Sequence, residues 1–397
     1  MSAGPAQPRE GATLHFSRDE YRSRIDRAVG ALGARDLDAI LLFAPESHYY
    51  LCGYDTFGFA MFQCLILDAN GALHLFTRAP DLRQAQQTST LDDEHIHVWV
   101  DRQGVEPAEQ LMSLLASLGL ANKRLGVETR TVGLTAWNWR ALEQALDAHV
   151  TLVEASDLVG HLRRDKSPRE IEYHRQAASL ADDAFDAALA TTAAGAFEGD
   201  ILAAMQGAVF RGGGDYAGNE FIIGSSHGAL LCRYRSGRRY LCEQDQLTLE
   251  WAGAYRRYHA AMMRTLLIGR AGDAHRRMHR ATVEALEACE AAMRPGAPMG
   301  DVFDAHARVL DDHGFAHARL NACGYGMGAV FNPIWVDFPM FFAGNPLPMD
   351  AGNVYFLHMI LMDSDNGLAM CLGHSVLVGD TGVERLSRHP TDLVTLD

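Results

Sequence analysis

Hydrophobic and polar positions form short alternating blocks that predict strands and helices in turn. The run at 38–43 is almost wholly apolar, which is typical of a strand buried on both faces. Apolar segments lie on both sides of Asn70-Gly71, a dipeptide that favours a tight hairpin turn. The pattern predicts an α/β domain over 14–162, preceded by a mobile tail over 1–13 that is rich in Gly, Pro and Ala.

A second domain is expected over 163–397. Its first helix is predicted to begin at Ser167 and Pro168, with Glu170 completing a capping box. Long helical patterns follow, and two apolar strands flank a turn at 363–367. Because helices come first and strands wrapped by helices come later, the order predicts an α+β fold rather than a doubly wound sheet.

Composition narrows the classes of function. The chain has 397 residues, of which 48% are hydrophobic, so two packed domains are expected. Its formal net charge of −15 argues against nucleic-acid binding and against attraction to an anionic membrane surface. The seven cysteines include no C-x-x-C pair, and the sequence has no visible leader or membrane span. We therefore expect a soluble, cytoplasmic protein.

Candidate chemistry begins with Glu250, a carboxylate inside an apolar, strand-like run. Burial disfavours the charged form of an acid and raises its pKa, which suits a general base or a carboxylate nucleophile. The residues alone leave a second interpretation open, in which this carboxylate pairs with Arg256, Arg257 or Arg264.

Glycine recurs at alternate positions in 323–328, and an apolar segment with Trp335 follows. Glycine lets a backbone approach a ligand closely, although a tight bend under a core would require the same residue type. No G-x-G-x-x-G precedes a helix at this place in the sequence, so the segment is not a dinucleotide-binding fingerprint.

Two histidines, His358 and His374, each lie in an apolar, strand-like context. A buried histidine needs a partner for each ring nitrogen, and a single one on an apolar face is usually part of the core. Two histidines on adjacent strands of one hairpin can converge on one pocket, which favours a functional role.

On these motifs the chain resembles the creatinase/prolidase/aminopeptidase P family, the pita-bread enzymes. The segment His48–Tyr54 is similar to a motif of the family's N-terminal domain, and 166–171 is similar to the segment that opens its catalytic domain. The resemblance implies a creatinase-type α/β domain followed by a pita-bread catalytic domain. It also implies a homodimer, in which the N-terminal domain of one subunit lies over the site of the other.

The resemblance also implies where a metal site would lie. The metallopeptidases of the family hold two divalent metals with two Asp, one His and two Glu, whose anionic oxygens offset the metal charge. The corresponding positions here are Glu250, Ala261, Tyr325, His358 and Gly373. Only one carboxylate and one imidazole remain in this set, so we expect neither a metal nor another cofactor.

Two metal-free branches of the family, creatinase and ectoine hydrolase, hydrolyse C–N bonds in small nitrogenous molecules. The catalytic histidine of creatinase would fall near Arg233 and its substrate-binding glutamate at Met263, so creatine itself does not fit. The spacing from Glu250 to Arg264 is similar to the ectoine hydrolase branch, whereas the late histidines depart from it. The resemblance implies a metal-independent hydrolase acting on a small cyclic amidine or guanidino acid.

Catalytic roles follow from the same resemblance. Glu250 would act as the nucleophile, or as a base toward water. His358 and His374 would exchange protons with the leaving nitrogen, and Tyr325 and Arg264 would support the developing charge.

Substrate contacts are expected from aromatic and polar side chains. Trp335, Tyr54 and Phe57 would form an aromatic wall, unless they serve only to pack the domains. Tyr258, His259 and Arg233 are the remaining candidates. Two other functions stay open: a metallopeptidase-like enzyme acting on Xaa-Pro bonds, and a catalytically dead relative that binds a ligand or partner.

Overall fold

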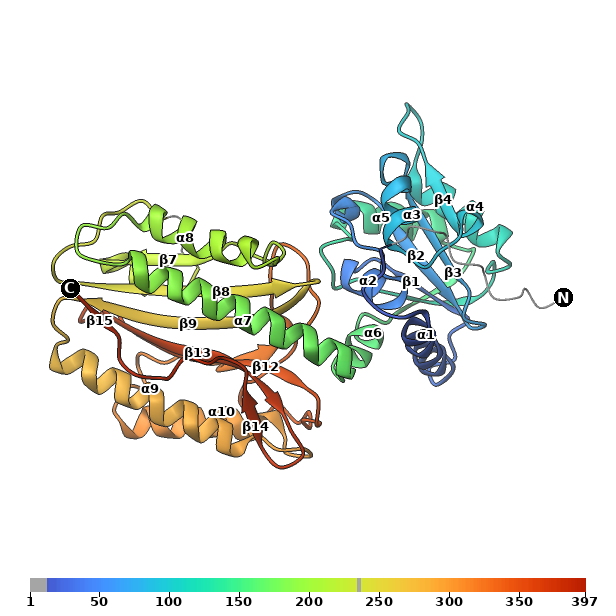
Figure 1. Ribbon diagram of the computed structural model, residues 1–397. Helices are drawn as coiled ribbons and strands as arrows, with labels where there is room; N and C mark the ends of the chain where they lie inside the picture. Colours follow the sequence, from blue (N-terminus) through green and yellow to red (C-terminus); the bar gives the residue numbers. More distant parts are fainter. Residues whose placement is uncertain (1–12, 234–236) are drawn as a thin grey trace. The chain divides into compact units, whose positions relative to one another are not determined.

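The structure is a computed structural model that describes residues 13–233 and 237–397 (Figure 1). The chain divides into two compact units, with the boundary between Arg163 and Arg164. All but the last residue of the predicted tail lies outside the described residues. That last residue, Thr13, is held by a hydrogen bond from its backbone N–H to the carbonyl oxygen of Gln87, at 2.8 Å.

A mixed sheet forms the centre of the N-terminal unit, with strands in the order β4-β3-β2-β1-β5-β6. Alternate residues of its central strand enter two hydrophobic cores, Ala39 and Leu41 on one face, Ile40 and Leu42 on the other. The prediction of a strand buried on both faces is therefore confirmed. The strands are β1 Ala39–Leu42, β2 Cys64–Asp68, β3 Leu73–Arg78, β4 Ile96–Trp99, β5 Arg124–Val127 and β6 Thr151–Glu154.

Helices cover this sheet and connect its parallel strands. They are α1 Arg18–Gly33, α2 Pro45–Cys52, α3 Leu82–Thr88, α4 Pro107–Ser117, α5 Ala136–Leu146 and α6 Asp157–Leu162. The hairpin predicted at Asn70-Gly71 joins β2 to β3, and Gly71 has the positive φ of 86° that such a turn requires.

The C-terminal unit is built on a larger sheet, with strands in the order β11-β10-β12-β13-β9-β8-β7. Helix α7 begins at the predicted capping box, where Ser167 and Glu170 exchange hydrogen bonds. The strands of this path are β7 Ile222–Ser225, β8 Asp245–Tyr255, β9 Tyr258–Ile268, β10 Gly324–Gly326, β11 Asp337–Met340, β12 Val354–Asp363 and β13 Leu368–Val378. The helices are α7 Pro168–Thr191, α8 Glu198–Arg211, α9 Asp273–Ala292 and α10 Met299–Asp312.

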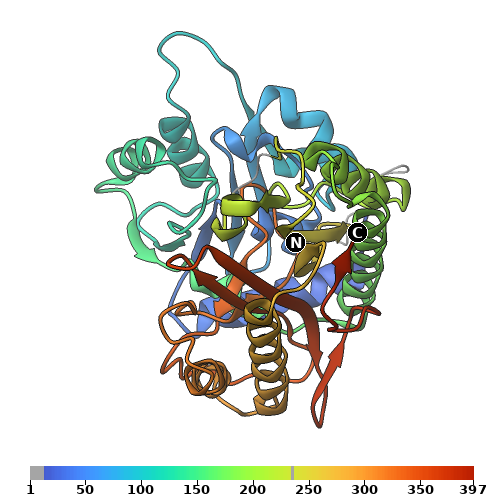
Figure 2. The ribbon, with the colours of Figure 1, turned by 90° about the vertical axis from the view of Figure 1, so that its left-hand side faces the viewer.

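One face of the larger sheet is covered by α7 and α9, with α8 beside α7 and α10 beside α9 (Figures 1 and 2). Trp251 of β8 donates from its indole nitrogen to the carbonyl oxygen of Ala181 in α7, at 2.8 Å. His374 of β13 contacts Glu290 of α9 at 2.7 Å. We call this side the helix face.

The opposite side, the site face, is defined by one row of paired residues across four strands. Glu250 of β8 pairs with Met263 of β9, Met263 with Gly373 of β13, and Gly373 with His358 of β12. Directly paired residues project to the same side of a sheet, so Glu250 and His358 share the site face. The prediction of an α/β domain followed by a domain in an α+β arrangement is confirmed. Within the described residues, no helix combines the length and the apolar character that a membrane crossing needs.

Candidate active site

A cavity of about 180 Å³ opens on the site face. Four of the predicted site residues line it with buried side chains: Glu250, Tyr325, Trp335 and His358. Arg233, predicted as a substrate contact, lines it as well, and its own side chain is exposed. The cavity therefore combines a carboxyl, a phenol, an imidazole and a guanidinium in one small space.

Glu250 is held by a short chain of hydrogen bonds. The Tyr325 hydroxyl donates to its Oε1 atom at 3.4 Å, and the indole nitrogen of Trp335 donates to the Tyr325 oxygen at 2.8 Å. Burial raises the pKa of Glu250 to about 7, although the Tyr325 hydrogen bond and the positive charge of Arg233 act in the opposite direction. Near neutral pH the carboxyl is therefore close to the midpoint of its titration.

His358 is the second titratable group that projects from the site face. Burial lowers its pKa to about 4, so its imidazole is neutral near pH 7. Its Nδ1 atom is buried and accepts or donates no hydrogen bond among the described residues. The ring lies 5.7 Å from that of Tyr325, centroid to centroid. A neutral imidazole with a free nitrogen can take up or release a proton beside the carboxyl.

The five positions that the resemblance assigns to metal ligands do not suit a pair of metal ions. Ala261 has no donor atom, and Tyr325 offers a phenol whose pKa is raised by burial. Gly373 offers no side chain, and a Cβ atom there would lie 2.6 Å from the Leu357 carbonyl oxygen and 3.0 Å from the Phe356 ring. Within the described part of the chain, no three His, Cys, Asp or Glu side chains form a group that could hold a metal.

Two corrections apply to the predicted catalytic set, because His374 and Arg264 do not lie beside Glu250. His374 follows Gly373, and successive residues of a strand point to opposite faces, so it lies on the helix face with Glu290. Arg264 follows Met263 and also points to the helix face, where its guanidinium lies 5.7 Å from the ring centre of Phe185.

Tyr258 and His259 are engaged elsewhere and do not line the cavity. The Tyr258 hydroxyl donates to Glu170 at 2.7 Å. His259 Nδ1 contacts the Arg257 carbonyl oxygen at 2.8 Å, and its Nε2 accepts from the backbone N–H of Gly218, also at 2.8 Å. Both ring nitrogens are occupied, so His259 fixes the backbone next to the cavity instead of contacting substrate.

Tyr54 and Phe57 belong to the N-terminal unit. Tyr54 is buried within that unit, where its hydroxyl donates to the Gln63 side chain at 3.3 Å and its ring stacks on His48. This position does not suit a ligand-facing side chain. Phe57 is 74% exposed and remains available to a partner or ligand.

Sequence reasoning missed several residues around the cavity. Asn219 lines it, and its side-chain oxygen accepts from the backbone N–H of Trp335 at 3.2 Å. Cys232 also lines it, and proximity to the predicted Arg233 was the only sequence signal for it. Apolar side chains complete the wall, among them Ile222, Leu320, Ile334 and Ile360.

Comparison with known proteins identifies relatives over nearly the whole chain. The chain is 28% identical to an uncharacterized hydrolase/peptidase of Sinorhizobium fredii, covering 97% of this chain and 99% of that protein. It is 26% identical to the ectoine hydrolase of Halomonas elongata, covering 96% of this chain and 98% of the enzyme.

Solved structures show the same fold. Dipeptidase PepE from Mycobacterium ulcerans superimposes with a TM-score of 0.83 at 24% identity, covering 96% of this chain and 99% of that one. A prolidase from Thermococcus sibiricus gives a TM-score of 0.86 at 19% identity, covering 96% and 100%.

Profiles of two families match the two units in turn. The Creatinase/Prolidase N-terminal domain matches residues 24–164, and Metallopeptidase family M24 matches residues 172–380. An N-terminal α/β domain joined to a pita-bread domain defines the class of two-domain hydrolases that includes creatinase and prolidase. The chain belongs to metallopeptidase family M24. At the five positions that the resemblance assigns to metal ligands, this chain has one carboxylate and one imidazole.

Proposed function

We propose that this protein is a metal-independent hydrolase of a C–N bond in a small nitrogenous metabolite, of cyclic amidine or guanidino-acid type. The observation that carries the proposal is that Glu250 and His358 line one cavity and are the carboxylate and the imidazole that remain at the five positions assigned to metal ligands. The ectoine hydrolase among the relatives supports this class of substrate.

In the proposed reaction, Glu250 promotes nucleophilic attack on an sp² carbon that is bonded to nitrogen. Its carboxylate either attacks that carbon or removes a proton from the attacking water. Tyr325 holds the carboxylate through its hydroxyl, and Trp335 in turn holds Tyr325. Arg233 at the cavity wall offers positive charge to an anionic part of the substrate.

His358 completes the proton transfers. Because its imidazole is neutral and its Nδ1 is free among the described residues, it can accept the proton that Glu250 removes from the attacking water. It then donates this proton to the leaving nitrogen, which cannot depart as an amide anion. His374 and Arg264 take no part in this step, since both project to the helix face.

The decisive experiment replaces Glu250 with Gln and measures turnover by mass spectrometry over ectoine, hydroxyectoine, creatine, guanidino acids and Xaa-Pro dipeptides. Gln keeps the shape of the side chain but removes its basicity and nucleophilicity, so turnover should fall at least about a hundredfold. Glu243→Gln is the matched control, because Glu243 is an exposed acid just before the same strand. Normal turnover in folded Glu250→Gln would overturn the proposal.

Two results of the same screen would favour the other functions. Turnover of Xaa-Pro dipeptides alone would indicate a peptidase. Tight binding of nitrogenous molecules without turnover, unchanged in Glu250→Gln, would indicate a binding protein. The homodimer implied by the resemblance stays a prediction, and sedimentation equilibrium of the full chain tests it.

A further inference from the structure

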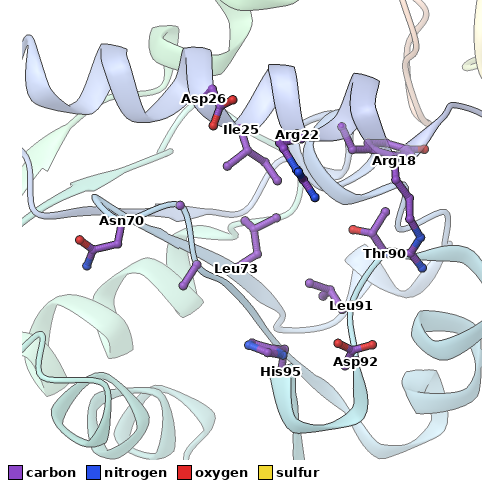
Figure 3. Close-up of a pocket in the computed structure, with 13 residues that line it drawn as sticks. Arg18, Arg22, Ile25, Asp26, Asn70, Leu73, Thr90, Leu91, Asp92 and His95 are labelled. Atoms are coloured by element: carbon purple, nitrogen blue, oxygen red, sulfur yellow. The ribbon is translucent and has the colours of Figure 1, made fainter. Parts of the chain in front are cut away.

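The N-terminal unit contains a cavity of about 350 Å³ that has no part in the proposed reaction. It lies between α1, the turn at Asn70-Gly71 and the segment 90–95. Figure 3 shows Arg18 and Arg22 reaching from α1 toward the segment that carries Thr90 and Asp92.

The two arginines differ from the other arginines of α1. Arg24 donates to Glu20 and to the Tyr50 carbonyl oxygen, and Arg27 donates to the Tyr50 hydroxyl. Arg18 and Arg22 make no ion pair or hydrogen bond through their side chains with any described residue. They are one turn apart, at i and i+4, so their guanidinium groups can close on one anionic group.

Asp92 stands on the opposite wall of the cavity. Its side chain is half-buried, and among the described residues its carboxylate has no partner. A partly buried charge is costly when nothing compensates it. Opposite charges thus face one cavity without contacting each other, which is the arrangement that a bridging ligand would complete.

Apolar side chains form the wall between these charges. Ile25, Leu73 and Leu91 line the cavity, and Leu73 and Leu91 are buried. A ligand that suits this cavity has an anionic group, a cationic group and an apolar body. With Asp26 also present, the two arginines and two aspartates leave the wall close to neutral, which favours a ligand without net charge.

We propose that this cavity binds a small zwitterionic amino acid with an apolar side chain. Arg18 and Arg22 hold the carboxylate, Asp92 holds the ammonium group, and the side chain lies against Ile25 and Leu91. The site is separate from the Glu250 cavity and does not depend on the reaction proposed for it.

The test uses three probes that differ only in their charges: L-leucine, 4-methylpentanoate without the ammonium group, and 3-methylbutylamine without the carboxylate. Calorimetric titration of the full chain should show saturable binding of L-leucine at millimolar concentrations or below. Each of the other two probes should bind at least about tenfold more weakly, because each loses one charged contact. Absence of saturable L-leucine binding, or equal binding of a singly charged probe, overturns the proposal.

Variants locate the binding. Arg22→Gln and Asp92→Asn should each weaken L-leucine binding at least about tenfold. Arg140→Gln, an exposed arginine of α5, and Glu250→Gln should leave it unchanged. Loss of binding in Glu250→Gln with normal binding in Arg22→Gln would assign the amino acid to the other cavity and overturn the proposal.

Discussion

His358 and His374 lie on neighbouring strands of one hairpin, yet their side chains leave opposite faces of the sheet. His358 pairs with Gly373, and His374 pairs with Leu357. The first imidazole therefore lines the cavity of Glu250, whereas the second binds Glu290 of α9.

Alanine at these two positions should have different effects. His358→Ala should lower kcat by about a hundredfold, the low end for loss of a positioned proton donor, with little change in unfolding temperature. His374→Ala should mainly destabilise, because it leaves a hole where a buried imidazole packed and removes one of the two partners of Glu290, which keeps Arg385. Steady-state kinetics and thermal unfolding of both variants check this. A catalytic loss confined to His374→Ala would contradict the assignment of faces.

Tyr325→Phe should shift the pH profile of turnover. The hydrogen bond from Tyr325 lowers the pKa of Glu250, so its removal should raise that pKa above about 7. If Glu250 acts as a carboxylate, turnover rises with pH through its pKa, and the rising limb moves to higher pH in the variant. The measurement is kcat/KM from pH 5 to 9 for both proteins. An unchanged limb would show that another group controls it.

Glu250→Gln should make stability less dependent on pH. The folded protein binds the Glu250 proton more tightly than the unfolded chain, since burial raises the pKa from 4.5 to about 7. In the wild type, the contribution of the Glu250 carboxyl to the free energy of unfolding is fully present below pH 4.5 and is lost as pH rises through about 7. The variant should therefore be more stable at pH 8, by up to about 3 kcal/mol, and nearly equal at pH 4.5.

Urea denaturation at both pH values measures this difference. Glu128, whose pKa burial also raises to about 7, titrates in both proteins and cancels in the comparison. A difference that grows toward low pH would contradict the prediction.

Chelation should leave turnover unchanged. Of the five positions assigned to metal ligands, Ala261 and Gly373 have no side chain that could bind a metal. The Tyr325 hydroxyl donates a hydrogen bond to Glu250. Dialysis against a strong chelator, followed by assay with and without added Mn²⁺, Co²⁺ and Zn²⁺, tests this. Loss of turnover that one metal restores would refute the metal-independent mechanism.

His306→Leu should leave stability unchanged or raise it by about 1–2 kcal/mol. His306 of α10 is fully buried, and neither ring nitrogen has a hydrogen-bond partner within the described residues. Burial lowers its pKa to about 3, so the wild type also loses stability as pH falls from 6.5 toward 3. Leucine removes both penalties. A marked loss of stability at pH 7 would show that the imidazole makes a contact that stabilises the fold.

Sequence patterns predicted the elements better than the arrangement of side chains around the site. The apolar run of β1, the turn at Gly71 and the capping box at Ser167 each have a local physical cause, and the structure contains all three. The hairpin of β8 and β9 was not foreseen. It turns at Arg256 and Arg257, both at positive φ, and arginine gives no signal for such a turn.

Errors within the site have a common origin in strand register. Successive residues of a strand point to opposite faces of the sheet, so an assignment that is off by one position places the side chain on the wrong face. His374 is the example, because it directly follows Gly373, the residue that pairs with His358. Partners across the fold are equally invisible in the chain. Nothing near Tyr258 in the sequence indicates its bond to Glu170, and nothing near Tyr54 indicates its burial against Gln63.

Gly373 bears on any attempt to build a metal pair into this cavity. Glutamate there would bring its Cβ against the Leu357 carbonyl and into the Phe356 ring, so the ligand cannot be added alone. The backbone at Leu357 would have to shift and Phe356 would have to become smaller, and the second change would open a hole in the packing around Tyr325, whose ring lies 5.4 Å away. An engineer would therefore need several simultaneous replacements, and the intermediates with fewer changes would have neither the ligands nor the support for Glu250.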